Sequence, residues 1–413
     1  MWKQDYNKND ANLLKNTKLI LECETMKSKK ILAALMAGAV ALCSSGCTIG
    51  GDKSWCAKSG DTQLPAGVYI YELFSAYNQA KTKAGYTTYM DMKTQTIDGK
   101  DAFTWTKDTA KNSINQIFVI DDMMKDLNLT LSDDDNKTIN TEATSAWNGS
   151  SSNAGYGSTL EKYNIAQSSF QIAYAEYYVK YQKVFEAIYG QGGSKEISAD
   201  DQKAYFEKNF ASFEMIPVAL YSMDSSTGSY SVMSDDDKAK LKAELEGYAN
   251  EVKGGKKSMS DVGTDYKNAH SDTVTASPYQ DVTTDLETSG LPTDVVTGIQ
   301  GMNGGDVQVL DIGSYYILVS KRDIKTQTDA ELQKEQTKLS VLNGLKGDEF
   351  RQDIEQKAEN YTNATFNTAC INAYTPDLFY TTPSSSAVDA SSTDTSSDTT
   401  STSDTVSSTS SAA

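Results

Sequence analysis

The chain has 413 residues and a formal net charge of -18. This length allows two or three domains with a sizeable core. The acidity argues against a nucleic-acid partner, because phosphate binding needs clustered Lys and Arg. Five cysteines and one histidine are too few for a metal cluster or a disulfide framework. We therefore expect no metal and no cofactor.

The first 46 residues divide into two segments. Residues 1–25 are polar and mixed in charge, and we interpret them as upstream sequence that is not native to the protein, with Met26 as the true start. In residues 26–46 a basic stretch with three lysines precedes an apolar run of 12 residues. This order predicts a secretory signal peptide. The run is too short for a permanent membrane-spanning helix. A cytoplasmic extension before a membrane anchor is the alternative.

The signal-like segment ends in Gly46-Cys47, which resembles the lipobox of bacterial lipoproteins. Ser44 stands where that motif usually has Leu. The resemblance implies a lipid on Cys47 and a location outside the cytoplasm, on the outer face of the membrane of a Gram-positive-type cell. Plain secretion is the alternative. Residues 47–62 then read as a polar tether.

Residues 63–200 carry helical spacing. Their longest apolar-aromatic stripe repeats at i, i+3, i+4 and i+7. It consists of Tyr163, Ala166, Phe170, Ala173, Tyr174, Tyr177, Tyr181, Val184, Phe185 and Ile188. Helix packing is the ordinary explanation of such a stripe, and a binding surface made of tyrosines is the other.

Residues 201–325 change to mixed spacing. We expect a strand over 213–223, a helix over 234–254 and a closing hairpin over 301–322, where β-branched and aromatic residues flank the turn at Gly313-Ser314. Residues 326–378 return to helical spacing. Residues 379–413 are mostly Ser and Thr, and we expect a disordered tail that cannot bury enough apolar surface to fold.

This order of segments resembles that of the PrsA-type and SurA-type foldases, in which a parvulin-type peptidyl-prolyl isomerase domain is inserted between helices. The phrase ISADDQKAYFEKNFASF, which begins at Ile197, resembles the entry into that domain. The resemblance implies an α+β fold in which the helices before and after the small parvulin-like α/β domain form one chaperone module.

The two pocket histidines of parvulins fall on Val218 and Tyr316 in this chain, so both are replaced. Asp272 lies near the position of the parvulin Cys or Asp. Tyr316 and Asp272 are thus the candidate catalytic residues. The resemblance gives a peptide-binding set of Val218, Leu220, Leu291, Val295 and Tyr316. The lone His270 lies in a helical phrase, where we expect a helix-end or surface residue.

These features together predict a lipid-anchored extracytoplasmic foldase or chaperone that binds unfolded secreted polypeptides, with weak or absent isomerase activity. A homodimer is an open alternative. An active isomerase is the first rival function, and a surface-display or solute-binding lipoprotein is the second. Cys56 and Cys370 form either a disulfide that joins the ends of the helical module or two free thiols.

Overall fold

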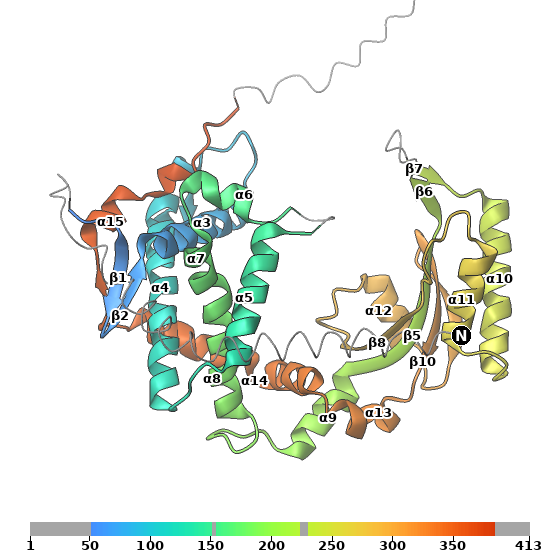
Figure 1. Cartoon of the computed structure of the whole chain (residues 1–413). Helices are drawn as coiled ribbons and strands as arrows, with labels where there is room; N and C mark the ends of the chain where they lie inside the picture. Colours follow the sequence, from blue (N-terminus) through green and yellow to red (C-terminus); the bar gives the residue numbers. More distant parts are fainter. Residues whose placement is uncertain (1–50, 151–153, 224–229, 385–413) are drawn as a thin grey trace, which may run out of the picture.

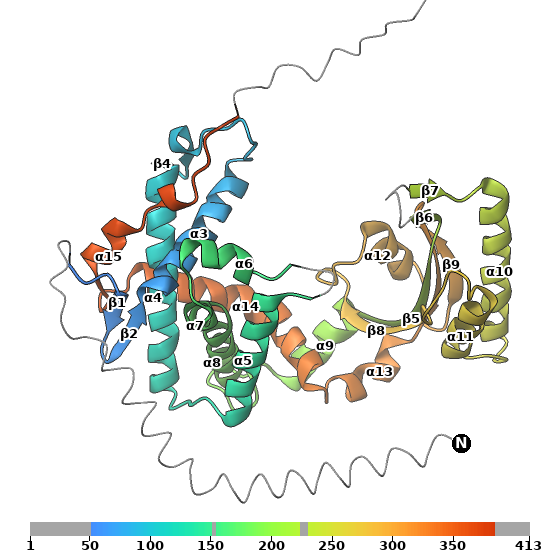
Figure 2. The same ribbon diagram turned by 45° about the horizontal axis from the view of Figure 1, so that its top comes forward.

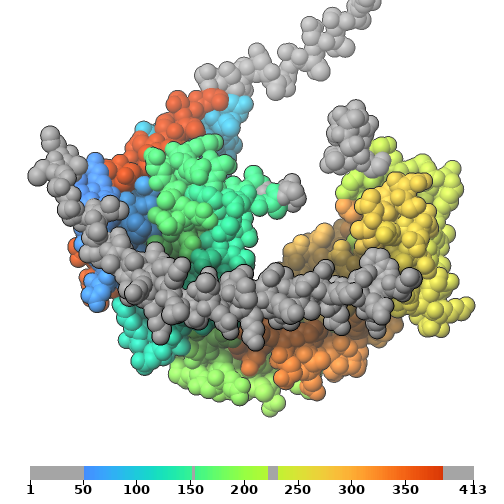
Figure 3. Space-filling model, viewed as in Figure 1, coloured from blue at the N-terminus to red at the C-terminus, as the bar shows by residue number. Residues whose placement is uncertain are grey.

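The computed structural model describes residues 51–150, 154–223 and 230–384. The chain folds into two lobes, a helical module and a smaller α/β domain, with α9 and α13 between them (Figure 1). Figure 2 shows the same separation after rotation, and the space-filling view in Figure 3 shows open space between the lobes on this face. The fold is therefore α+β. The predicted upstream extension, signal segment and Cys47 lie outside the described residues.

The helical module contains helices from both sides of the α/β domain in the sequence. From the first part come α3 (Ala66–Lys83), α4 (Ala102–Asp126), α5 (Asp133–Asn148), α6 (Gly157–Leu160), α7 (Gln167–Phe170), a π-helical turn (Gln171–Glu176) and α8 (Tyr177–Tyr189). From the last part come α14 (Glu335–Glu359) and α15 (Thr368–Ala373). Helix α14 packs against α4 and α8.

A core of aromatic and aliphatic residues joins these segments. Phe350 on α14 is buried against Phe185 on α8, with ring centroids 5.4 Å apart, and Val119 on α4 belongs to the same cluster. The free energy of unfolding of the module therefore depends on apolar area that is buried between segments more than 150 residues apart in the sequence.

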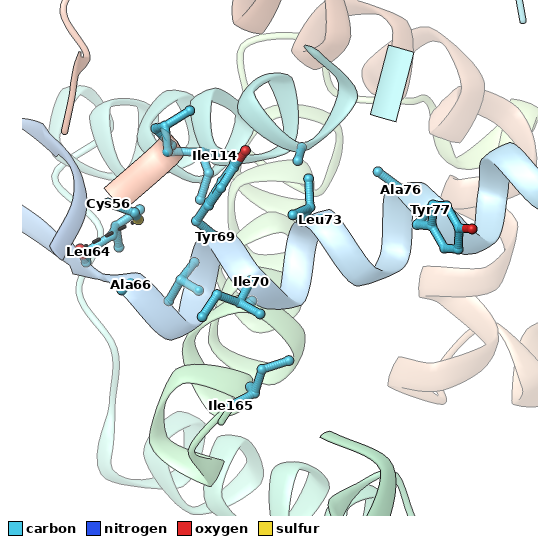
Figure 4. Packing of buried hydrophobic residues seen from close by; sticks show 14 of the residues in the cluster. Cys56, Leu64, Ala66, Tyr69, Ile70, Leu73, Ala76, Tyr77, Ile114 and Ile165 are labelled. Atoms are coloured by element: carbon cyan, nitrogen blue, oxygen red, sulfur yellow. Dashed lines mark hydrogen bonds between the residues drawn. The ribbon is translucent and has the colours of Figure 1, made fainter. Parts of the chain in front are cut away.

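A small antiparallel sheet closes the module, and sequence reasoning missed it. Strand β1 (Trp55–Ser59) lies between β2 (Thr62–Pro65) and β11 (Thr365–Phe366). We expected residues 47–62 to be a tether, and for residues 55–62 this prediction was wrong. They belong to the folded module, because Cys56 is fully buried among Leu64, Tyr69 and Ile114 (Figure 4). The Gly60-Asp61 turn, where Gly60 has φ +52°, is the local signal for this hairpin.

The expected disordered tail also begins too early at residue 379. Phe379 is buried, with ring centroids 4.7 Å from Tyr163 and 5.4 Å from Phe74. Tyr380 donates a hydrogen bond to Asp91. These two aromatic side chains attach the end of the chain to the module as far as Ser384, and residues 385–413 lie outside the described residues.

The α/β domain is entered through α9 (Ala199–Asn209) and left through α13 (Ile324–Glu331). Between them lie β5 (Phe210–Ala219), β6 (Tyr221–Met223), β7 (Tyr230–Val232), α10 (Asp235–Lys253), α11 (Met259–Ala269), β8 (Gln280–Asp285), α12 (Thr293–Gln300), β9 (Val307–Asp311) and β10 (Tyr315–Lys321). Ser234 and Ser258 cap α10 and α11 by accepting from the amides of Asp237 and Asp261.

The four-stranded antiparallel sheet of this domain has the order β8-β5-β10-β9, and helices cover both of its faces. Side chains alternate between faces along each strand. Ile216, Val218, Tyr316 and Leu318 pack with α10 and α11, whereas Phe213, Met215, Ile317 and Val319 pack with α12. Two separate cores result, one on each side of the sheet.

Candidate functional site

The two positions that replace the parvulin histidines are direct cross-strand neighbours. Tyr316 on β10 pairs with Val218 on β5. Both side chains are buried, with exposed fractions of 6% and 8%, in the cluster beneath α10 and α11. Leu220 belongs to the same cluster. These three residues of the predicted peptide-binding set therefore do lie together, but they lie in a buried core and not at a surface.

The expected peptide-binding set does not form one site. Leu291 and Val295 lie in the cluster on the α12 face, on the opposite side of the sheet from Tyr316. The reason is that a shift of one residue along a strand moves a side chain to the other face. The cross-strand pair that faces α12 is Ile317 and Pro217, one residue away from the positions that we expected.

Asp272 and His270 lie apart from both faces. Asp272 is exposed in the turn that follows α11, so it does not join the buried Tyr316. His270 is the C-cap of α11, as a helix-end residue should be. Its Nε2 lies 3.0 Å from a carboxylate oxygen of Glu244, and its ring lies 4.3 Å from that of Tyr266. The histidine therefore links the end of α11 to α10 through Glu244.

The α12 face carries a row of half-exposed apolar residues at one end of the sheet, which we call the α12 shelf. It consists of Pro217, Ala219, Leu291, Leu310, Ile312 and Tyr315. At its end the hydroxyl oxygens of Tyr221 and Tyr315 lie 2.5 Å apart. This hydrogen bond raises the pKa of Tyr221. The shelf has an apolar surface for a proline ring and hydroxyl donors beside it, and its residues within the described ranges, Tyr221 included, carry no carboxylate, thiol or imidazole.

The helical module exposes a second candidate surface, which we call the aromatic patch. The rings of Tyr156 and Tyr174 lie 6.2 Å apart, and Tyr178 follows Tyr174 by four residues on the same continuous helical segment. Their exposed fractions are 51% for Tyr156, 38% for Tyr174 and 57% for Tyr178. The Tyr174 ring stacks on the fully buried Phe170 at 4.7 Å, and the Tyr156 ring lies 5.9 Å from Phe170. Two of the three tyrosines are thus held on a rigid base, which lowers the entropy cost of binding.

A π-helical turn at Gln171–Glu176 contains Tyr174, one of the three patch residues. A π-turn adds a residue to a helical turn and so shifts the spacing of everything after it. The predicted stripe assumed one uninterrupted helix from Tyr163. In the structure Tyr163 precedes the helix, and Tyr174 comes to the surface. Nothing in the local sequence predicts this change of spacing.

Other candidate features are reported briefly. Cys56 and Cys370 are both buried, free thiols, so the disulfide that we considered is not formed here. The described residues contain no group of three His, Cys, Asp or Glu side chains placed to hold a metal ion. In the same ranges no helix is long and apolar enough to cross a membrane.

Comparisons with known proteins found similarity in structure alone. No family model matches the chain, and no curated protein matches it. Among the solved structures to which it is similar are three of a bacterial foldase.

These structures are of foldase protein PrsA from three bacteria. The protein from Streptococcus pneumoniae is 17% identical, and the match covers 68% of this chain and 97% of that one with a TM-score of 0.34. The Bacillus subtilis protein is 14% identical, and the match covers 64% of this chain and 91% of that one with a TM-score of 0.31. The Lactococcus lactis protein is also 14% identical, and the match covers 79% of this chain and 97% of that one with a TM-score of 0.31.

Proposed function

We propose that the protein is an extracytoplasmic foldase or chaperone that holds unfolded secreted polypeptides. The aromatic patch carries this proposal, because exposed aromatic side chains on a buried base are typical of binding surfaces. The α12 shelf offers a second apolar surface on the other lobe. Unfolded chains expose apolar side chains, and holding them lowers their aggregation without any chemical step.

The location follows from the N-terminal segment. We propose that the chain is exported and anchored by a lipid on Cys47 to the outer face of the membrane. A single acyl chain holds a protein weakly, so stable anchoring needs more than one chain. A homodimer is part of the same proposal as the alternative to a monomer.

The test is suppression of aggregation by residues 48–413 and by the variant Tyr156→Ser/Tyr174→Ser/Tyr178→Ser. Reduced lactalbumin serves as the aggregating protein, because its acidity removes attraction by charge. We expect the triple variant to need about tenfold more protein for the same suppression. A factor of ten corresponds to a total loss of about 1.4 kcal/mol, which is the cost of losing about one well-packed aromatic anchor.

Tyr89 provides the matched control. It is 53% exposed on the same module, but it lies in the loop after α3 and not on the segments that carry the patch, so Tyr89→Ser should suppress aggregation as well as the unsubstituted chain does. Equal loss in Tyr89→Ser and in the triple variant would contradict a defined binding surface. If the unsubstituted chain does not suppress aggregation at all, the result would contradict the chaperone proposal and favour surface display or solute binding.

A second candidate function is prolyl isomerisation, favoured by the Tyr221–Tyr315 hydroxyl pair on the α12 shelf. A catalyst of this reaction must favour the twisted X–Pro amide, for which a hydroxyl donor beside an apolar surface suffices. We expect weak or absent catalysis with a short X–Pro peptide. Any activity should be lost in Tyr315→Phe and kept in Tyr316→Phe, because Tyr316 is buried on the other face. Activity that depends on Tyr316 would restore the original assignment.

A further inference from the structure

Strand β8 forms a free edge of the sheet in the α/β domain. It pairs with β5 on one side, and the described residues contain no strand on its other side. In both ribbon views β8 lies at the edge of the sheet that is nearer to the helical module (Figures 1 and 2). An exposed edge offers main-chain donors and acceptors to another extended chain.

The register shows which main-chain groups of β8 face outward. Paired residues of antiparallel strands alternate between those that exchange hydrogen bonds and those that do not. The amide of Leu286 donates to Asn209 at 3.2 Å, so even-numbered residues of β8 face β5. Ser212, which pairs with Thr283, accepts instead from Arg322 on the β10 side at 2.8 Å. The main-chain groups of Asp281 and Thr283 therefore point away from the sheet.

These outward groups have no main-chain partner within the ranges that the structure describes. They border a groove of about 860 Å³ between β8 and the helices α13 and α14. Thr337 and Ser340 of α14 line its far wall. A groove of this size beside a free strand edge has room for a short extended segment.

The lining of the groove fits a polypeptide main chain better than a charged ligand. Its charged side chains already have partners: Asp281 pairs with Arg322 at 2.7 Å, Glu331 pairs with Lys334 at 2.7 Å, and Asp285 accepts from Tyr205 at 2.8 Å. The other polar side chains along it are hydroxyls and amides, from Thr283, Thr284, Thr288, Gln327, Gln336, Thr337 and Ser340. Such groups bond to amides whatever the neighbouring side chains are.

We propose that an extended segment of an unfolded polypeptide adds to the edge of β8 as a fifth strand, bonded to the main chain of Asp281 and Thr283. This inference rests on the proposed function and names a site for its client. Main-chain hydrogen bonds supply the affinity in this mode of recognition, which makes it independent of client sequence. It complements the aromatic patch, which binds side chains.

A matched pair of peptides tests the inference on the unaltered full chain. The probe is a fluorescent octapeptide of alternating Thr and Val. One derivative is N-methylated at residues 3 and 5, which blocks one edge of the peptide, and the other at residues 4 and 5, which blocks both. We expect the first to bind within about twofold of the parent and the second about tenfold more weakly. On either edge the second derivative loses one hydrogen bond and places a methyl group between the strands, and tenfold corresponds to about 1.4 kcal/mol. Equal binding of the two derivatives would overturn the inference.

A pair of protein variants tests the position of the site. Thr283→Pro removes an outward amide without breaking the ladder to β5, whereas Thr283→Val keeps that amide. We expect about tenfold weaker peptide binding for the proline variant and little change for the valine variant. Hydrogen exchange over residues 280–285 should also slow when the parent peptide binds. Unchanged exchange there would overturn the inference, and if the patch variant still loses suppression of aggregation, the proposed function stands without it.

Discussion

Replacing Phe350 by alanine is expected to destabilise the protein by about 3–5 kcal/mol, the usual cost of removing a fully buried phenylalanine. The Phe350 ring lies 4.7 Å from Tyr181, 5.4 Å from Phe185 and 6.1 Å from Tyr189, all of them on α8. Its loss leaves a cavity between the first and last parts of the helical module. Urea unfolding followed by circular dichroism measures the effect.

The control for this prediction is Tyr178→Ala, a change at a mostly exposed ring on the same helix α8. It should alter the free energy of unfolding by no more than about 0.5 kcal/mol. If Phe350→Ala is equally mild, α14 does not hold the module together, and the two ends of the chain fold independently of each other.

Replacing Glu72 by glutamine is expected to stabilise the protein at alkaline pH. Burial on α3 raises the pKa of Glu72 to about 8, although a hydrogen bond from Ser113 opposes the shift. In the unfolded chain a glutamate has a pKa of about 4.3. Between these values the folded state holds a proton that the unfolded state releases, so the free energy of unfolding falls as pH rises through this window and stays low above it.

Glutamine removes the titration and keeps the shape of the side chain. We expect the Glu72→Gln variant to match the unsubstituted chain near pH 4 and to exceed it by about 2 kcal/mol at pH 9, with partial exposure limiting the effect. Ser113→Ala should act in the opposite sense and lose stability mainly at high pH, because Ser113 stabilises the charged carboxylate. Urea unfolding at both pH values measures these differences, and parallel pH profiles for all three proteins would contradict them.

Sequence reasoning predicted the larger elements because their spacing and caps are local signals. The helix that Ser234 caps and the hairpin around Gly313 both form as expected. It missed the sheet of β1, β2 and β11, because β11 is a two-residue strand that lies more than 300 residues from its partner. Only the folded chain brings those segments together.

The candidate site shows a finer limit. Motif matching placed Tyr316 within one residue of the face that α12 covers, yet that one residue decides between a buried core and an accessible surface. The exposed Tyr174 likewise lies within a π-helical turn, where the spacing of an ordinary α-helix does not hold. Both depend on backbone geometry that residue types alone do not determine.

The most direct test of the central claim is photo-crosslinking from the aromatic patch. A benzoylphenylalanine replaces Tyr178 in one protein and Tyr89 in another, so both carry an exposed reactive ring on the helical module. Each is irradiated with reduced, carboxymethylated lactalbumin, which stays unfolded. We predict strong crosslinking from position 178 and little from position 89. Equal crosslinking from both positions, or none from 178, would contradict a chaperone that holds its client at the patch.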